Sequence, residues 1–168
     1  RCAALLNEWL ALEAKRDADF VVVEREQEHS LDIGPLTLRL RPDRVDAIDD
    51  GRYVVVDYKT GTVSRSAWLG ERPSDPQLPL YTLLDDRVAG LTFARVKQAD
   101  PAFVYLGDDL GFSRRDKGLA AQLKASHTTP VDWPTLTEMW RSDLTRLAEA
   151  FAGGEAAIDP LPKACTYC

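Results

Sequence analysis

The sequence predicts an α/β domain, and three observations carry this prediction. Apolar residues recur at helical spacing in residues 2–14, alternate strictly with polar residues in 36–41, and return to helical spacing in 132–152. The chain has 168 residues, 45% of them hydrophobic and 29% charged. This composition is typical of one soluble globular domain with a proper core.

The first expected element is an amphipathic helix over residues 2–14, with Glu8 and Glu13 turned outward. Its apolar side chains are Cys2, Leu5, Leu6, Trp9 and Leu10. The following run 20–23 is β-branched and aromatic, and it continues into a charged stretch that ends near His29. This region is expected to form an edge strand.

An antiparallel hairpin is expected next. Leucines alternate with threonine and arginine in residues 36–41, until Pro42 interrupts the ladder and ends the strand close to Asp43. The turn sequence 49–51 precedes a second β-prone run, Tyr53 to Lys59. We therefore expect these two runs to pair with each other.

Two more helices are predicted. Ser74 or Asp75 is expected to cap the first, with Pro76 at its first helical position. The second covers residues 132–152 and ends at Gly153. Its apolar stripe, expected to lie in the core, consists of Leu136, Trp140, Leu144, Leu147 and Phe151.

The segment between these two helices is expected to contain strands at 91–97 and 102–106, where β-branched and aromatic residues return. Residues 107–130 are expected to be loop-rich. The order is thus a helix, three strands, a helix, further strands and a long outer helix.

The net charge of −6 argues against a domain that holds DNA by electrostatics alone, but it does not exclude a nuclease, whose metal site needs carboxylates. Two local basic clusters have either a DNA-binding or a plain surface interpretation. They consist of Arg39, Arg41, Arg44 and Arg52, and of Arg114, Arg115 and Lys117.

The chain has no apolar run of roughly 18 to 20 residues and no leader sequence, so a cytoplasmic location without membrane contact is expected. Because it begins at Arg1 inside a predicted helix and stops at Cys168, we expect a fragment of a longer protein. The spacing Cys165-x-x-Cys168 favours a metal or cluster site over a disulfide, and Cys2 is isolated.

Three charged residues predict a chemical centre. Asp57 and Lys59 are two apart on a strand, so their side chains share a face. Asp43 is expected roughly opposite Asp57 across the predicted hairpin. Two carboxylates with open positions for water and phosphate suit Mg²⁺ or Mn²⁺ rather than zinc. A metal there acidifies bound water, and the lysine favours the developing negative charge.

Gln77 and Tyr81 are four residues apart on the predicted helix, so they share a face and can orient a phosphate or a water. Each feature alone has an ordinary interpretation. An Asp-x-Lys pair is usually a solvated ion pair, and a glutamine or tyrosine on a helix is usually part of the surface.

Together, in this order and spacing, the residues resemble the PD-(D/E)XK nuclease superfamily, and specifically the RecB and AddB nuclease domains of bacterial repair helicase-nucleases. The resemblance is strongest over residues 36–84. It implies a restriction-endonuclease-like core, with a mixed central sheet flanked by helices. It also implies metal ligation by Asp43, Asp57 and the Tyr58 carbonyl, and contact of Lys59 with the nucleophilic water.

The resemblance further implies that Gln77 and Tyr81 handle the DNA backbone, and that the products are a 5′-phosphate and a 3′-hydroxyl. The expected cofactor is Mg²⁺ or Mn²⁺. The expected partners are DNA and a helicase-nuclease subunit, in recombination and double-strand-break repair.

One departure concerns the metal site, which in this family usually includes a histidine or acid from a helix before the first strand. The first helix here offers only Glu8 and Glu13, so the ligand is expected upstream of the chain. His29 and His127 are expected to be surface residues, and Glu24 is either an outer acid or structural.

Iron-sulfur members of the family carry one distant cysteine and a terminal group of three. Residues 160–168 are expected to begin such a segment, with Cys165 and Cys168 as ligands of a 4Fe-4S cluster in the full-length protein. Cys2 is wrongly placed for the distant ligand, and a reduced tail is the alternative for this chain.

Two other functions stay open. One is a nuclease-like scaffold that binds DNA or a partner subunit without cutting. The other is an unrelated α/β binding domain in which Asp57 and Lys59 form only a salt bridge.

Overall fold

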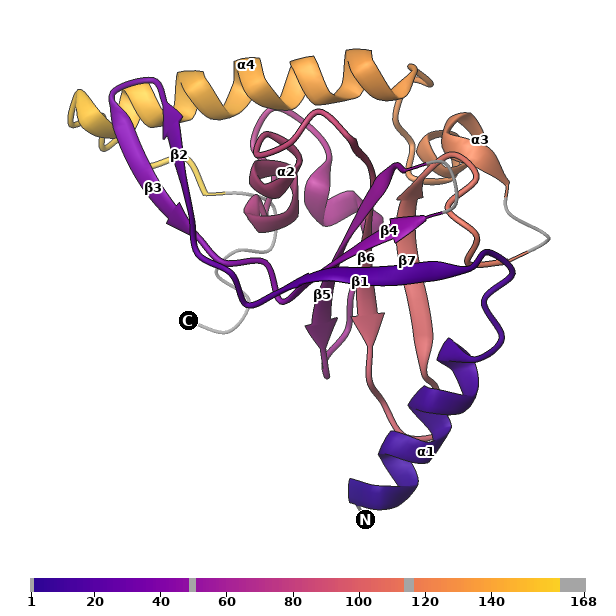
Figure 1. The fold of residues 1–168 in the computed structure, drawn as a ribbon. Helices are drawn as coiled ribbons and strands as arrows, with labels where there is room; N and C mark the ends of the chain where they lie inside the picture. Colours follow the sequence, from indigo (N-terminus) through magenta and orange to yellow (C-terminus); the bar gives the residue numbers. More distant parts are fainter. Residues whose placement is uncertain (1, 49–50, 114–116, 161–168) are drawn as a thin grey trace.

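The computed structural model describes residues 2–48, 51–113 and 117–160. Mixed α/β structure is confirmed (Figure 1). The elements in chain order are α1 (Cys2–Glu13), β1 (Phe20–Arg25), β2 (His29–Ile33), β3 (Leu36–Leu40), β4 (Arg44–Ile48), β5 (Tyr53–Lys59), the 3-10 helix η1 (Arg65–Trp68), α2 (Gln77–Thr82), β6 (Val88–Arg95), β7 (Ala102–Gly107), α3 (Gly118–Ala125) and α4 (Trp133–Ala152).

A five-stranded mixed sheet forms the centre, in the order β1-β4-β5-β6-β7. Strands β1, β4 and β5 are antiparallel neighbours, β5 and β6 are parallel, and β6 and β7 are antiparallel. The parallel step requires a crossover, which contains η1 and α2. β1 lies at the edge of the sheet, as expected, but it ends at Arg25.

The predicted hairpin between residues 36–41 and 53–59 is wrong. β3 pairs instead with β2 in a separate two-stranded sheet, and the partner of β5 is β4. Pro42 lies between β3 and β4, where the missing N–H separates the two ladders. β4 was not predicted because Arg44 and Asp46 interrupt its apolar pattern.

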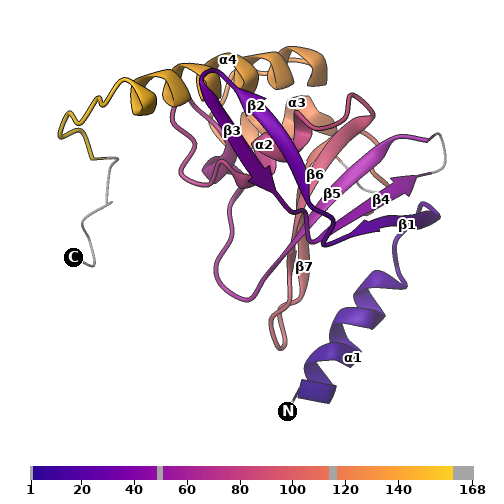
Figure 2. The same ribbon diagram turned by 60° about the vertical axis from the view of Figure 1, so that its left-hand side comes forward.

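Helices and the small hairpin cover the sheet. Figure 1 shows α4 running beside the β2–β3 hairpin and α2, while α1 lies apart near the opposite end of the sheet; Figure 2 shows the same separation from a second direction. The main core lies between the sheet and α2, α3 and α4. Its fully buried side chains include Trp68, Leu78, Leu91, Phe93, Leu106, Leu119, Leu123 and Leu136.

The long helix α4 begins as predicted, because the Asp132 side chain accepts a hydrogen bond of 2.9 Å from the Thr135 N–H. Its stripe is buried at Leu136, Trp140 and Leu144. The stripe does not extend to Phe151, which is 75% exposed in the last turn of the helix. Burial along α4 therefore stops before the apolar pattern does.

Helix α3 lies in the region expected to be loop-rich. It has eight residues and begins at Gly118, which has a left-handed φ of +62°. Its Gln122 side chain donates to the Gly107 carbonyl and accepts from the Gly107 N–H, at 2.9 and 3.0 Å. A helix this short gives only two turns of apolar periodicity, and its inward face includes a polar residue, so the pattern is weak.

The start of α2 differs from its prediction by one residue. Pro76 is the N-cap and Gln77 the first helical residue, while the Asp75 carboxylate accepts a long hydrogen bond of 3.4 Å from the Gln77 N–H. Among the described residues, no helix is long and apolar enough to cross a membrane.

Gly111 joins the loop after β7 to the linker between α1 and β1. Its carbonyl accepts from the Asp17 and Ala18 N–H groups at 2.9 and 3.3 Å, and its φ is +69°. A Cβ atom on this residue would overlap the Ala18 side chain. The contact therefore requires glycine for both its conformation and its space.

We expect Gly111→Ala to lower the free energy of unfolding by about 2–4 kcal/mol, from left-handed strain plus overpacking. Urea denaturation measures this change. Gly61→Ala is the matched control, because a Cβ atom there meets nothing within 4 Å, and it should change stability by less than about 0.5 kcal/mol. Equal effects of the two variants would contradict the role of the Gly111 contact.

Candidate active site

The pairing of β4 with β5 brings the two predicted acidic ligands together. Arg44 is the partner of Val56, so continuing this register by one residue places Asp43 opposite Asp57. The Tyr58 N–H donates to Asp43 Oδ2 at 2.9 Å. Although the predicted hairpin had the wrong first strand, the expected juxtaposition of the two carboxylates is present.

Asp57 and Lys59 form a close ion pair at the end of β5. Asp57 Oδ2 lies 2.7 Å from Lys59 Nζ, and the residue is only 2% exposed. The contact lacks hydrogen-bond orientation, so this buried oxygen has no hydrogen-bond partner among the described residues. The charge of Asp57 Oδ2 is therefore balanced by the Lys59 ammonium without a well-oriented hydrogen bond.

Burial and charge shift both members of this pair. Burial raises the pKa of Asp57, and this effect outweighs the opposing influence of Lys59. Burial lowers the pKa of Lys59, but the close contact with the Asp57 carboxylate and its charge outweigh this effect, so the pKa of Lys59 is raised. The amine therefore stays protonated at neutral pH.

A chain of hydrogen bonds connects Lys59 to helix α2. Lys59 Nζ donates to Gln77 Oε1 at 3.3 Å, and Gln77 Nε2 donates to the Tyr81 hydroxyl at 2.8 Å. The Tyr81 hydroxyl donates to the Arg41 carbonyl at 3.0 Å. Tyr81 is 4% exposed, so its phenol anchors α2 to the segment before Asp43, and Gln77 is the residue nearer to the centre.

Asp75 is a residue whose part in the centre was missed, since it was interpreted only as a helix cap. Its charge is close enough to raise the pKa values of both Asp57 and Lys59. Asp75 lies in the crossover between β5 and β6, so its proximity to Lys59 depends on the path of that crossover and not on a local sequence pattern. The centre thus contains three carboxylates around one ammonium group.

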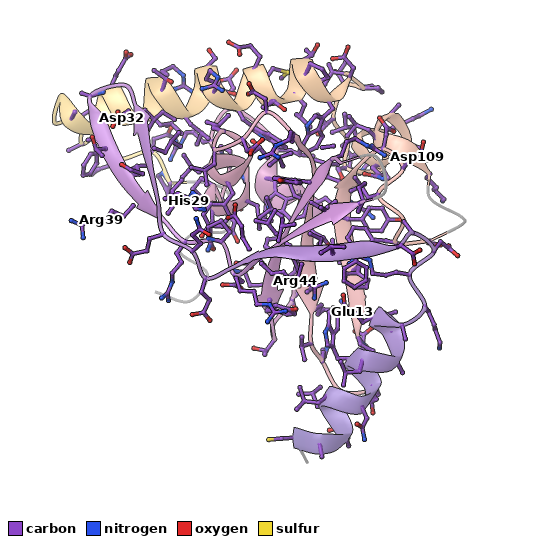
Figure 3. All side chains as sticks on the ribbon, in the orientation of Figure 1. Glu13, His29, Asp32, Arg39, Arg44 and Asp109 are labelled. Carbon is purple, nitrogen blue, oxygen red and sulfur yellow. The ribbon has the colours of Figure 1, made fainter. Side chains whose placement is uncertain are left out.

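The opposite face of the same strands carries a buried ionic network. Arg44 donates to both oxygens of Asp46, at 2.5 and 2.8 Å, and to Glu13 Oε1 at 2.8 Å. Arg16 donates to Asp46 Oδ2 at 2.6 Å, and its guanidinium lies 3.8 Å from the Phe20 ring centroid. Figure 3 shows Arg44 and Glu13 where α1 approaches the sheet.

This network shows that the expected outward orientation of the α1 acids is wrong. Glu13 faces Arg44, and Glu8 accepts from the Ala99 N–H at 2.7 Å. Conversely, Leu6 and Leu10 of the predicted apolar face are 54% and 60% exposed. Neither acid of α1 is free to join Asp43 and Asp57.

Among the described residues, neither histidine pairs with Asp43 or Asp57. His29 Nε2 lies 2.8 Å from Glu24 Oε2, so Glu24 has a structural partner, and His127 is exposed. Within residues 2–48, 51–113 and 117–160, no group of three or more histidine, cysteine, aspartate or glutamate side chains is arranged to hold a metal. Cys165 and Cys168 lie outside the described residues, and Cys2 is exposed.

The arginines of the first predicted basic cluster separate in space. Arg44 is enclosed by acids, and Arg52 donates to the Asp108 and Asp109 carbonyls at 2.9 and 3.1 Å. Arg39 and Arg41 are exposed. Of the second cluster, Arg114 and Arg115 lie outside the described residues, while Lys117 is exposed.

The donors present fit a hard divalent cation. Asp43 and Asp57 supply carboxylate oxygens, one of them buried without a hydrogen bond, and the Tyr58 carbonyl is part of the same strand end. Oxygen ligands of this kind suit Mg²⁺ or Mn²⁺. The set is small, so the remaining coordination positions would be left for water and substrate.

Comparison with known proteins gives one family. A profile of the PD-(D/E)XK nuclease superfamily matches residues 1–168. No curated protein matches. The solved structure described as the crystal structure of SSO0001 is similar at 17% identity and a TM-score of 0.47, over 98% of this chain and 63% of that chain. The chain thus spans less than two thirds of the length of that protein.

Arg44→Met should lower the free energy of unfolding by about 2–3 kcal/mol, because it removes charged hydrogen bonds from buried Asp46. Thermal or urea denaturation gives this value. Arg39→Met, at an exposed position of β3, is the control and should stay within about 0.5 kcal/mol. If both variants unfolded like the wild type, the network would not stabilise the fold.

Proposed function

Because the chain belongs to the PD-(D/E)XK nuclease superfamily, we propose that it is a divalent-metal-dependent deoxyribonuclease whose centre is formed by Asp43, Asp57 and Lys59. The observation that carries the proposal is the close ion pair beside Asp43, in which the buried Asp57 Oδ2 atom lies 2.7 Å from Lys59 Nζ. Asp57 and Lys59 lie among the last three residues of β5, and Asp43 lies just before β4.

Asp43, Asp57 and the Tyr58 carbonyl would hold the metal. When bound, Mg²⁺ or Mn²⁺ would acidify a coordinated water and stabilise negative charge on the phosphate. Lys59 would place a positive charge near the attacking oxygen and so stabilise the negative charge that develops on the phosphate. Gln77 orients this amine through its Oε1 atom.

The finer role rests on the sequence resemblance to RecB and AddB nuclease domains. We infer cleavage to a 5′-phosphate and a 3′-hydroxyl, in recombination or double-strand-break repair beside a helicase subunit. A 4Fe-4S cluster that includes Cys165 and Cys168 in a longer protein belongs to the same proposal.

A non-cutting scaffold is the second candidate. It is favoured by the engagement of Glu8 and Glu13 with other groups, which leaves the acidic centre without a contribution from α1. Such a scaffold would bind DNA or a partner subunit through the same fold. Measurements of metal binding and of DNA cleavage distinguish the nuclease from the scaffold.

Calorimetric titration with Mg²⁺ and Mn²⁺ tests the metal site directly. We expect binding by the wild type, and loss of at least tenfold in affinity in both Asp43→Asn and Asp57→Asn, since each removes a ligand charge. Asp32→Asn, on the exposed face of β2, should bind like the wild type. Unchanged binding in the two site variants would exclude the shared carboxylate site.

Cleavage of a labelled oligonucleotide tests the chemistry. Lys59→Ala should reduce the Mg²⁺-dependent rate by roughly a hundredfold or more, because the developing charge loses a stabilising cation. Lys124→Ala, at an exposed position of α3, should retain the wild-type rate. A folded wild type that binds metal and DNA but cuts nothing would favour the scaffold.

A further inference from the structure

Asp75 is a carboxylate of the centre that the proposed chemistry does not use. It is half-buried and lies in the crossover between β5 and β6, one residue before the N-cap of α2. Its backbone N–H donates to the Ala67 carbonyl of η1 at 2.9 Å, and the neighbouring Trp68 is fully buried. The backbone of Asp75 is therefore held against the core, independently of what its side chain contacts.

Capping of α2 is the ordinary role for such a residue, but the geometry gives this role little weight. The N-cap position belongs to Pro76, which has no side-chain hydrogen bond to the helix. Asp75 Oδ1 accepts from the Gln77 N–H only at 3.4 Å, which is longer than the usual range of about 2.7–3.2 Å. An asparagine would offer the same acceptor, so the helix does not require the negative charge.

The charge of Asp75 acts on the acidic centre. No described cation lies within ion-pair distance of its carboxylate. Burial is the main cause of the raised pKa of Asp57, and the charges of Asp43 and Asp75 add to it. For Lys59, burial lowers the pKa, while Asp57 and the same two carboxylates raise it. The three carboxylates and the one ammonium leave two negative charges, which one divalent cation would balance.

Lys59 and a divalent cation would compete for Asp57. Lys59 Nζ lies 2.7 Å from Asp57 Oδ2. A cation held by Asp43 and Asp57 would share this carboxylate with the ammonium, and the two positive groups would repel each other. The hydrogen-bond acceptor of the ammonium is Gln77 Oε1, at 3.3 Å, which is uncharged. Binding of the cation would thus remove charge balance from Lys59 that Gln77 cannot replace.

The position of Asp75 allows it to supply this balance. The Lys59 side chain is 32% exposed and flexible, so its ammonium can move without repacking the core. Gln77 contacts both charged residues, because its backbone N–H donates to Asp75 and its side chain accepts from Lys59. The carboxylate and the ammonium are therefore neighbours across one residue of α2.

We propose that Asp75 is a positioning residue, which balances the Lys59 ammonium when Asp43 and Asp57 hold a divalent cation and so keeps the ammonium in the centre. This inference rests on the proposed nuclease function and deepens it. Asp75 acts through Lys59 and is not itself a ligand of the cation. This role agrees with the absence, among the described residues, of three acidic side chains arranged to hold a metal.

Calorimetric titration of the whole chain with Mn²⁺ tests the proposal. Asp75→Asn keeps the size and the acceptor of the side chain but removes its charge, and it should weaken Mn²⁺ binding by about tenfold. Asp75→Glu keeps the charge and should bind within about threefold of the wild type. Glu71→Gln, at an exposed position of the same crossover, controls for the loss of one acidic charge and should bind like the wild type.

A second titration separates action through Lys59 from direct attraction of the cation. In a Lys59→Met background the ammonium is absent, so Asp75→Asn should weaken Mn²⁺ binding by less than about twofold. Lys59→Gln is titrated in parallel, so that the result does not depend on the folding of one variant. An equal effect of Asp75→Asn with and without Lys59 would overturn the proposal, because Asp75 would then act on the cation itself. Wild-type affinity in Asp75→Asn would overturn it as well.

Cleavage of DNA at saturating Mn²⁺ distinguishes this inference from the proposed function. Asp75→Asn should lower kcat by about fivefold or more and leave the KM for DNA within about twofold, because a displaced ammonium affects the reacting groups rather than substrate binding. If the wild type cuts DNA and Asp75→Asn binds Mn²⁺ and cuts equally well, the positioning role fails and the nuclease function stands. If the titrations give the expected pattern without any cleavage, the positioning role stands and the scaffold candidate is supported. A wild type that binds no Mn²⁺ would overturn both.

Discussion

The register between β4 and β5 is the constraint on which the proposed site depends. It places Asp43 opposite Asp57, and it fixes which residues of both strands face α2 and which face α1. Because side chains alternate along a strand, a slip of one residue would send Asp43 to the wrong face and Arg44 into the main core. Strand pairing therefore brings Asp43 and Asp57 together, and the contacts within the proposed centre depend on that pairing.

The ionic network behind the sheet opposes such a slip. Asp46 is fully buried and depends on Arg44 and Arg16 for its charge balance. Burying these charges is costly compared with an apolar pair, but leaving one of them unpaired is worse. The free-energy penalty for misaligning β4 and β5 is thus much larger than the net stabilisation from the aligned network. This difference favours one register of the two strands.

The sequence predicted most of the elements and the grouping of Asp43, Asp57, Lys59 and Gln77, because these depend on local alternation and on short spacings. It did not predict β4, because charged residues such as Arg44 and Asp46 are typical of loops. Their burial depends on Glu13 and Arg16, which are distant in the sequence. It also paired β3 with the wrong strand, since alternation identifies a strand without identifying its neighbour. The proximity of Asp75 to Lys59 depends on how the crossover returns to the sheet, which no local pattern contains.

Asp57, Tyr58 and Lys59 alternate between the two faces of the sheet, because successive side chains of a strand point to opposite sides. The side chains of Asp57 and Lys59 turn toward the acidic centre, and the middle side chain, Tyr58, turns toward Arg44 and Trp9. The surroundings of Tyr58 therefore differ from those of its two neighbours in the chain. Exposed substitutions on the face of Tyr58 can therefore change that surface of the domain while the charged residues on the opposite face of β5 stay as they are.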